Sequence, residues 1–171
     1  MTEEKLAYQC KKQDPLAQKE LYETYYIEMK RLVMRYIKEQ DEVFDCLSKG
    51  FYSVLTKIDQ FSYRGVGSLG AWVRRIMINE ALANIRASKK ELFLVADDQM
   101  DTDVGYEEAD VSYLYHCIQR LPDGARAIFN LVAVEGYSHK EAAQLMAISE
   151  GTSRSQLVYA RNKIKELLKG N

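Results

Sequence analysis

The chain has 171 residues, of which 47% are hydrophobic, and its 24 basic and 25 acidic residues leave a net charge of -1. This composition is typical of a folded protein with one domain or two small ones, and it excludes a largely disordered chain. No apolar run approaches the ~20 residues of a membrane-spanning helix. The start, Met-Thr-Glu-Glu-Lys, does not resemble a signal peptide. We therefore expect a cytoplasmic protein without direct membrane insertion.

The residues that most often carry chemistry form no recognisable site. Cys10, Cys46 and Cys117 are far apart, and neither His116 nor His139 has paired cysteines at a metal-binding spacing. The sequence also lacks a Gly-rich phosphate loop and a defensible Ser/His/Asp or Cys/His arrangement. We expect no disulfide framework, no metal, no cofactor and no enzymatic activity.

Helical periodicity dominates the first half of the chain. Asp14 and Pro15 predict the start of a helix that reaches about Lys38. Asp41 is expected to cap a second helix ending near Gln60, and Ser68 to cap a third that runs into Lys89-Lys90. Apolar residues at helical spacing predict the buried faces of the first two helices: Leu21, Tyr25, Met29, Leu32, Val33 and Tyr36, then Val43, Phe44, Leu47, Phe51, Val54, Leu55 and Ile58.

The loop from Phe61 to Ser68 joins the second and third helices, and it combines aromatic rings, glycines and a cation. The following helix adds Trp72, Arg75 and Asn79. Cations beside flat rings are typical of proteins that hold the phosphates and unstacked bases of single-stranded nucleic acid. The alternative interpretation is that Trp72 belongs to the hydrophobic core.

A composition change divides the chain. Between Asp97 and Asp110 there are many acidic residues and no basic one, which predicts a flexible acidic linker. No strand-like alternation is long enough to predict a sheet. The sequence therefore predicts an all-α protein of two small helical domains, residues 1–92 and 111–171, joined by the linker 93–110.

The second domain begins with a helix from about Val111 to Arg120. Leu121-Pro122 opens another helix, which ends near Gly136. Ser138 and Glu141 then form a predicted capping box for a short helix. After a break at residues 147–149, Ser149 is expected to cap a longer helix that runs to the end of the chain. This spacing is typical of a helix-turn-helix.

The last predicted helix has two distinct faces. One face is expected to be buried: Ser153, Leu157, Ala160, Ile164, Leu167 and Leu168. The opposite face carries Gly151, Ser155, Val158, Tyr159 and Asn162, flanked by Arg154, Arg161 and Lys165. Cations in this position favour phosphate contacts from a helix lying in a DNA major groove. Two amphipathic helices at a turn are also common in all-α domains, so this pattern alone leaves DNA binding open.

Several motifs occur in an order that resembles one protein family, the extracytoplasmic-function (ECF) sigma factors of the sigma-70 family. They are, in sequence, Asp45, residues 61–65, residues 71–76, Asn79, Leu121-Pro122, residues 135–138 and residues 150–155. The resemblance implies a subunit that binds core RNA polymerase and promoter DNA. The first domain would dock on the polymerase and open the minus-ten element, and the second would read the minus-thirty-five element as a duplex.

The resemblance also implies roles for particular residues. The loop from Phe61 to Ser68 and Asn79 would hold a base flipped out of the non-template strand, Trp72 would support the loop, and the acidic linker would correspond to the connector that passes near the polymerase active site. The expected minus-ten contacts are Phe61, Tyr63, Arg64, Gly65, Trp72, Arg75 and Asn79. The expected minus-thirty-five contacts are Gly151, Thr152, Arg154, Ser155, Val158, Tyr159, Arg161, Asn162 and Lys165. An anti-sigma factor is a further partner that the family often has.

The chain departs from the family pattern at the expected polymerase-binding residues, Asp45, Ser48 and Lys49. Ser48-Lys49 stands where the family usually has Gln-Glu, which reverses a charge. Tyr159 stands where an Arg is frequent. The alternative hypothesis is therefore a sigma-like protein-interaction or DNA-binding regulator that has lost productive polymerase docking. A plain helix-turn-helix regulator is a third interpretation, but such a protein has no need of a base-capturing loop.

Overall fold

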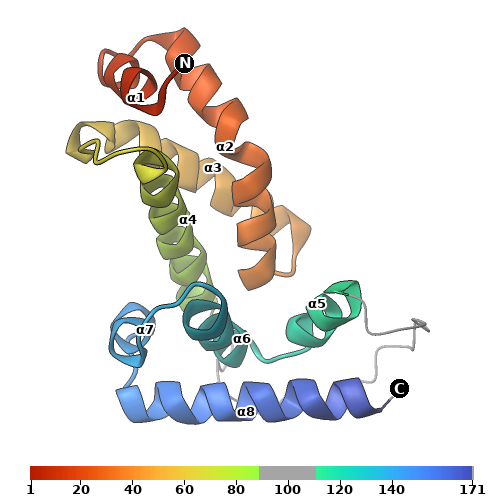
Figure 1. The fold of residues 1–171 in the computed structure, drawn as a ribbon. Helices are drawn as coiled ribbons and strands as arrows, with labels where there is room; N and C mark the ends of the chain where they lie inside the picture. The colour runs from red at the N-terminus through yellow and green to blue at the C-terminus, as the bar shows by residue number, and fades with distance from the viewer. Residues whose placement is uncertain (89–110, 171) are drawn as a thin grey trace. The chain divides into compact units, whose positions relative to one another are not determined.

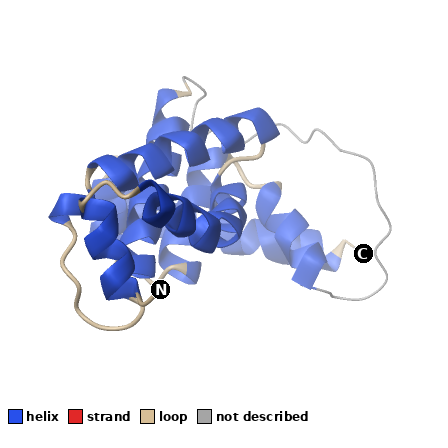
Figure 2. Ribbon diagram, turned by 90° about the horizontal axis from the view of Figure 1, so that it is seen from above, coloured by secondary structure: helices blue, strands red, loops and turns tan. Residues whose placement is uncertain are grey.

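The computed structural model describes residues 1–88 and 111–170. All regular elements in these two ranges are helices (Figure 2), which confirms the predicted all-α class. The chain divides into two compact units, Met1–Asn84 and Ile85–Asn171. The predicted linker, the boundary at residue 92 and Lys89-Lys90 lie outside the described residues.

The N-terminal unit contains four α-helices and a short 3₁₀-helix (Figure 1). They are α1 (Glu3–Lys11), α2 (Pro15–Tyr36), α3 (Gln40–Thr56), η1 (Ile58–Gln60) and α4 (Ser68–Ala87), whose last turn extends into the second unit. The predicted cap of α2 is confirmed, since the Asp14 carboxylate accepts the backbone N–H of Leu16 at 2.9 Å. Sequence reasoning missed α1, although Thr2 caps it and Glu3 and Glu4 follow in its first turn.

Two predicted helix caps are wrong. Glu39 occupies the N-cap position of α3 without a side-chain cap, and Asp41 lies inside the first turn. A carboxylate is favourable there because it faces the positive end of the helix dipole. Ser68 is the first residue of α4, and its hydroxyl accepts the backbone N–H of Arg64 at 3.2 Å. Ser68 therefore stabilises the preceding loop.

The core of the N-terminal unit lies between α2, α3 and α4. All six predicted core residues of α2 are buried, as are most of those predicted on α3. The exceptions are Phe44, which is 40% exposed with Lys30 over its ring at 5.2 Å, and Leu55, which is half-buried. A Cβ at Gly50 of α3 would collide with Met77 of α4. The helices thus approach closely at this glycine, and this contact fixes α4 against α3.

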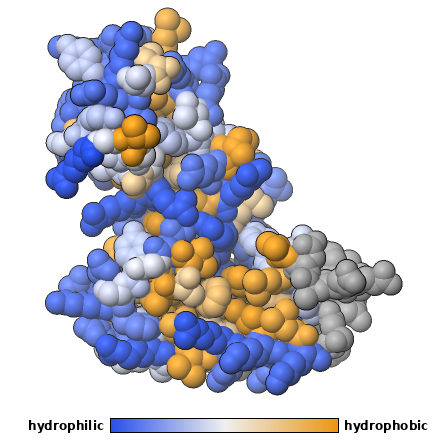
Figure 3. Space-filling view, viewed as in Figure 1, coloured by the Kyte–Doolittle hydropathy of each residue, from blue (hydrophilic) through white to orange (hydrophobic). Residues whose placement is uncertain are grey.

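The C-terminal unit is built on one long helix, α8 (Glu150–Lys169). Figure 1 shows α5, α6 and α7 along one side of it; these helices span Val111–Gln119, Asp123–Phe129 and His139–Met146, and a π-helical turn, η2 (Asn130–Val134), continues α6. A core cluster joins α5, α6 and α8: Cys117, Leu121, Ala125, Ala160 and Ile164. On the face drawn in Figure 3, hydrophobic residues gather over the upper part of this unit, and the edge along α8 is mainly hydrophilic.

Arg126 is a buried charge that sequence reasoning did not identify. Its guanidinium is almost fully buried, and it donates to the carbonyl of Leu121 at 2.8 Å and to the Asp123 carboxylate at 2.7 Å. Burial lowers the pKa of Arg126, and the charge of Asp123 opposes that change. The side chain therefore ties the turn between α5 and α6 to the first turn of α6.

Candidate nucleic-acid interface

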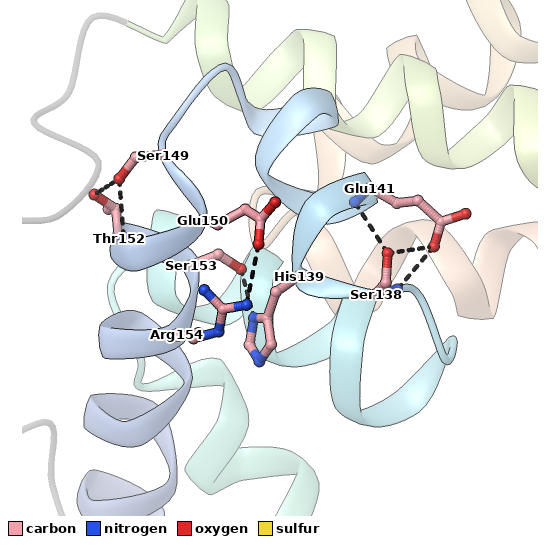
Figure 4. Close-up of polar contacts among 8 residues, drawn as sticks. All are labelled: Ser138, His139, Glu141, Ser149, Glu150, Thr152, Ser153 and Arg154. Atoms are coloured by element: carbon pink, nitrogen blue, oxygen red, sulfur yellow. Dashed lines mark hydrogen bonds and ion pairs between the residues drawn. The ribbon is translucent and has the colours of Figure 1, made fainter.

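Each of the two helices of the helix-turn-helix, α7 and α8, begins with a local side-chain cap (Figure 4). The Ser138 hydroxyl accepts the Glu141 backbone N–H at 3.1 Å, and the Glu141 carboxylate accepts the Ser138 backbone N–H at 2.8 Å. This is the predicted capping box of α7. The Ser149 hydroxyl accepts the Thr152 backbone N–H at 3.1 Å and so caps α8 as predicted. Both helix starts are therefore confirmed.

A contact between α7 and α8 and the backbone conformation of the turn between them hold the two helices at their angle. His139 Nδ1 lies 2.8 Å from the hydroxyl of Ser153, which is fully buried (Figure 4). Ala147 adopts a left-handed conformation, with φ of 55°, at the end of α7. Sequence reasoning missed the His139–Ser153 contact. The one signal for it was a serine on the otherwise apolar face of α8, because a buried hydroxyl needs a polar partner.

The burial pattern of α8 agrees with the predicted inner face, with one error. Ser153, Leu157, Ala160 and Ile164 are buried, and Leu167 is partly buried against the core cluster. Leu168 is 39% exposed. It was predicted to be buried, but it lies in the last turn of α8, where Lys169 and Gly170 are exposed as well.

Most of the predicted duplex-contacting residues lie on the exposed side of α8. Exposed residues of this set are Gly151, Arg154, Ser155, Val158, Arg161, Asn162 and Lys165. Arg154 forms an ion pair with Glu150 at 3.0 Å, one turn earlier (Figure 4). Arg161 and Lys165 are one helical turn apart and Arg154 lies about two turns before them, and together they give this surface the positive charge that binding to a phosphate backbone requires. Their role in DNA binding stays a prediction.

Two members of that set, Thr152 and Tyr159, are only partly exposed. Tyr159 is partly buried and packs against the core cluster of the C-terminal unit, so its ring is not on the fully exposed face where the helical pattern placed it. Thr152 is half-buried, and its hydroxyl lies 2.9 Å from that of Ser149. Thr152 thus contributes to the cap at the start of α8, and Tyr159 helps to pack α8 against the core cluster.

The loop between η1 and α4 has a buried part and an exposed part. Phe61 is 4% exposed, and its ring lies 5.5 Å from that of the partly buried Trp72, centroid to centroid. The Phe61 ring thus closes the core behind the loop, and its expected contact with a base stays a prediction. Trp72 supports Phe61, as expected from the resemblance, and it also agrees in part with the alternative core interpretation.

The exposed part of this loop carries the residues that a single strand could reach. Tyr63 is 38% exposed, and Arg64 is exposed beside it. Gly65 and Gly67 have φ of 115° and 87°, which favour glycine because a Cβ would clash with the backbone. The loop thus turns sharply with its backbone open to a ligand.

On α4, Trp72, Arg75 and Asn79 occur at helical spacing and share one face. Arg75 and Asn79 are exposed. The Asn79 amide makes no side-chain hydrogen bond to another residue in the described ranges, so its donors and acceptor are available. This arrangement is compatible with a base-reading amide, a role that stays a prediction.

The predicted polymerase-binding residues, Asp45, Ser48 and Lys49, are all exposed on α3. The Ser48 hydroxyl donates to the Phe44 carbonyl one turn earlier, at 2.9 Å. This local bond leaves the charges of Asp45 and Lys49 as the distinctive features of the surface.

The remaining reactive groups are core residues. Cys10, Cys46 and Cys117 are free and buried. Burial raises the pKa of the Cys10 thiol to about 11 and of the Cys46 thiol to about 12, so the nucleophilic thiolate is scarce at neutral pH. Within residues 1–88 and 111–170, no group of acidic, His and Cys side chains could hold a metal ion. No helix in those ranges is long and apolar enough to cross a membrane.

Two family models match the chain, one mainly in the N-terminal unit and the other within the C-terminal unit. The model described as Sigma-70 region 2 matches residues 21–91. The model described as Sigma-70, region 4, matches residues 112–164. The first match contains the loop and the exposed face of α4, and the second contains α7 and most of α8.

Curated relatives share about a quarter of the sequence over nearly the whole chain. An ECF RNA polymerase sigma-E factor from Haemophilus influenzae is 26% identical over 188 aligned positions, which cover 98% of each chain. The ECF RNA polymerase sigma factor SigM from Mycobacterium tuberculosis is 25% identical over 164 positions, which cover 91% of this chain and 79% of the relative.

Solved structures share the fold. The sigma factor RpoE of Bartonella quintana, solved in complex with the anti-sigma factor NepR, has a TM-score of 0.56 and 21% identity; the match covers 88% of this chain and 96% of that one. CnrH, solved in complex with the cytosolic domain of CnrY, has a TM-score of 0.53 and 21% identity, and the match covers 97% and 96% of the two chains.

Proposed function

We propose, from the premise that this chain belongs to the ECF sigma factors of the sigma-70 family, that it directs core RNA polymerase to specific promoters and initiates transcription there. The observation that carries the proposal is the occurrence of a region 2 match and a region 4 match in one chain, in that order. Such a chain acts in the cytoplasm, with polymerase and promoter DNA as its partners, and it is not an enzyme in its own right.

The two proposed DNA contacts use different chemistry. In the C-terminal unit, exposed Arg154, Arg161 and Lys165 lie on a capped α8 beside small side chains, which suits a helix that reads a minus-thirty-five duplex. In the N-terminal unit, exposed Tyr63 and Asn79 lie in a loop and on the helix that follows it. Rings and an amide suit an unstacked base of the minus-ten element.

We also propose that an anti-sigma factor restrains this chain. The support is that both similar structures are complexes, RpoE with the anti-sigma factor NepR and CnrH with the cytosolic domain of CnrY. Chemical cross-linking in the source cells, followed by purification of the chain, should recover a small protein that suppresses transcription when added back. Recovery of polymerase subunits alone would contradict this part of the proposal.

The experiment that tests the main proposal is transcription in vitro with purified core polymerase, the full chain and a library of randomised upstream DNA. We expect transcripts whose templates share two short motifs at a fixed separation upstream of the start. Core polymerase without the chain is the control, and it should give no such enrichment.

One observation favours the alternative function, a sigma-like regulator without productive docking. Lys49 is exposed on α3 at the position where the resemblance implies an acidic residue. Duplex binding by the chain, without co-purification of polymerase and without transcripts from the library, would establish that alternative and contradict the main proposal.

A further inference from the structure

Helix α1, to which neither the motifs nor the family matches assign a role, is bonded to the start of the nucleic-acid loop. Lys11 Nζ at the end of α1 donates to the carbonyl of Phe61 at 2.6 Å and lies 3.5 Å from the carbonyl of Asp59. A charged donor on a backbone carbonyl is stronger than a neutral hydrogen bond. Lys11 therefore fixes the point where the chain leaves η1 and enters the loop.

The start of α1 holds the other end of the same loop. The Glu3 carboxylate accepts the backbone N–H of Gly67 at 2.7 Å and the hydroxyl of Tyr25 at 2.9 Å. Gly67 directly precedes α4, so Glu3 and Lys11 together bond both ends of the loop to one helix. The loop is thereby held in place before any ligand binds, which lowers the entropic cost of binding.

A pocket of about 320 Å³ lies between α1 and this loop. Glu4, Tyr8 and Lys11 line it from α1, and Ser62 and Tyr63 line it from the loop. Tyr8 is 58% exposed and Tyr63 is 38% exposed. Large aromatic rings lose hydrophobic stabilisation when they are left in water, so two half-exposed rings on one pocket are a surface suited to a flat ligand.

The charges around the pocket distinguish a base from a phosphate. Glu4 places a carboxylate in the wall, which repels a phosphate group, and the ammonium of Lys11 in the same wall already donates to the Phe61 carbonyl at 2.6 Å. Lys12 lies outside the wall with its Nζ 5.6 Å from the centre of the Tyr8 ring, and Arg64 is exposed on the loop next to Tyr63. These charges favour an uncharged base inside the pocket, with the neighbouring phosphates bound by Lys12 and Arg64 outside it.

We propose that this pocket, bounded by α1 and the loop, receives a second unstacked base of single-stranded DNA, stacked on Tyr8 and Tyr63. The inference rests on the proposed function, because it assumes that the loop meets a melted strand. It adds α1 to the single-strand interface and names Tyr8 as a binding residue, apart from the base expected at Asn79.

The test uses the full chain assembled with core polymerase. The probe is a pool of single strands of random sequence, about 12 nucleotides long, with 5-iodouracil in place of thymine for photocross-linking. We expect cross-linked nucleotides on Tyr8 as well as on the loop, mapped by mass spectrometry of the peptides. Tyr8→Ala should weaken binding of the pool about fivefold to a hundredfold, the range for loss of one base-stacking contact.

Two further variants separate stacking from a structural effect. Tyr8→Phe keeps the ring and should bind as the wild type does. Leu16→Ala removes another exposed apolar side chain, 76% exposed at the start of α2, and should leave binding unchanged. Tyr8→Ala leaves Glu3 and Lys11 in place, so the loop should keep its thermal stability.

The possible failures point to different causes. Cross-links at Tyr63 or on α4, with none at Tyr8 and full affinity in Tyr8→Ala, would overturn the pocket and leave the proposed function standing. The absence of any cross-link to the N-terminal unit of the wild type would overturn the single-strand contact itself, and the pocket with it.

Discussion

Arg154, in the second turn of α8, is exposed and is paired with Glu150 at 3.0 Å. A surface ion pair of this kind contributes only ~0–1 kcal/mol. A DNA phosphate or a guanine edge can therefore displace Glu150 at little cost, and the pair holds the guanidinium near the proposed duplex in the meantime.

We predict that Arg154→Ala weakens binding of the full chain to its upstream duplex element by about 1–3 kcal/mol, the value of one good side-chain contact to a base. Fluorescence anisotropy with the duplex selected from the transcription library measures this. Lys169→Ala removes an equal charge from the exposed end of α8, and it is the matched control. Equal binding by Arg154→Ala and the wild type would show that Arg154 faces away from the groove.

At the residue scale, the sequence predicted side-chain chemistry better than side-chain environment. Asn79 and Arg154 are exposed, as their proposed roles require. Phe61 and Tyr159 were included among the DNA contacts, yet one is buried and the other packs against the core. An aromatic ring near a core boundary can take either environment, and neighbours distant in the sequence decide which.

Among the elements, the turn between α5 and α6 depends on a buried guanidinium. Arg126 satisfies the Leu121 carbonyl and the partly exposed Asp123 carboxylate. Removing the guanidinium takes the buried donor away from the Leu121 carbonyl and the ion-pair partner away from Asp123, whose carboxylate still reaches water.

We predict that Arg126→Met lowers the free energy of unfolding of the C-terminal unit by about 1–3 kcal/mol, the cost of losing hydrogen bonds from a charged donor. Methionine fills part of the volume of the arginine side chain, so the lost stability is attributed mainly to the charge and its hydrogen bonds. Hydrogen exchange of peptides from α5 and α6 reports the change. Arg120→Met, at an exposed arginine nearby, should change it by less than about 0.5 kcal/mol. Comparable protection in the two variants would refute the role of Arg126.

Helix boundaries followed from the sequence where the signal is local. The capping box of Ser138 and Glu141 and the caps at Asp14 and Ser149 were all predicted, because each is formed by residues two or three positions apart. Helix α1 was missed although its cap at Thr2 is equally local. Its tertiary role was not predictable from a local pattern, because Lys11 bonds to a carbonyl 50 positions later. Such pairs exist only once the tertiary fold has formed.

Across the whole molecule, the proposed function assigns polymerase docking to the exposed surface of α3. The resemblance implies an acidic residue at the position of Lys49, facing basic residues of the polymerase. Lys49→Glu should therefore strengthen association with a conventional core polymerase, because it replaces like-charge repulsion with attraction. A pull-down at low and high salt measures this, with Lys57→Glu, also exposed, as the control. Weaker binding by Lys49→Glu would indicate that the cognate polymerase carries an acidic partner for Lys49.

Strand opening is the property that separates a sigma factor from a simple duplex binder, and Asn79 provides its test. Extruding a base costs a few kcal/mol of stacking and pairing, which hydrogen bonds to the base edge must offset. The exposed Asn79 amide has both donors and an acceptor for such an edge. It lies on the same α4 face as Trp72, which packs behind the loop.

We predict that Asn79→Ala leaves polymerase binding and duplex binding intact and lowers promoter opening by about tenfold, which corresponds to the loss of roughly 1.4 kcal/mol from one hydrogen-bonded contact. Permanganate reactivity of unpaired thymines in the polymerase complex measures opening. Ala83 lies one turn further along α4 and is also exposed, so Ala83→Asn tests whether any amide on this face suffices, and it should leave opening unchanged. If Asn79 had a purely structural role, Asn79→Ala would lower thermal stability and keep normal opening at a permissive temperature. Because Asn79 is exposed, we expect the opposite result: unchanged stability and a loss of opening at every temperature at which the chain is folded.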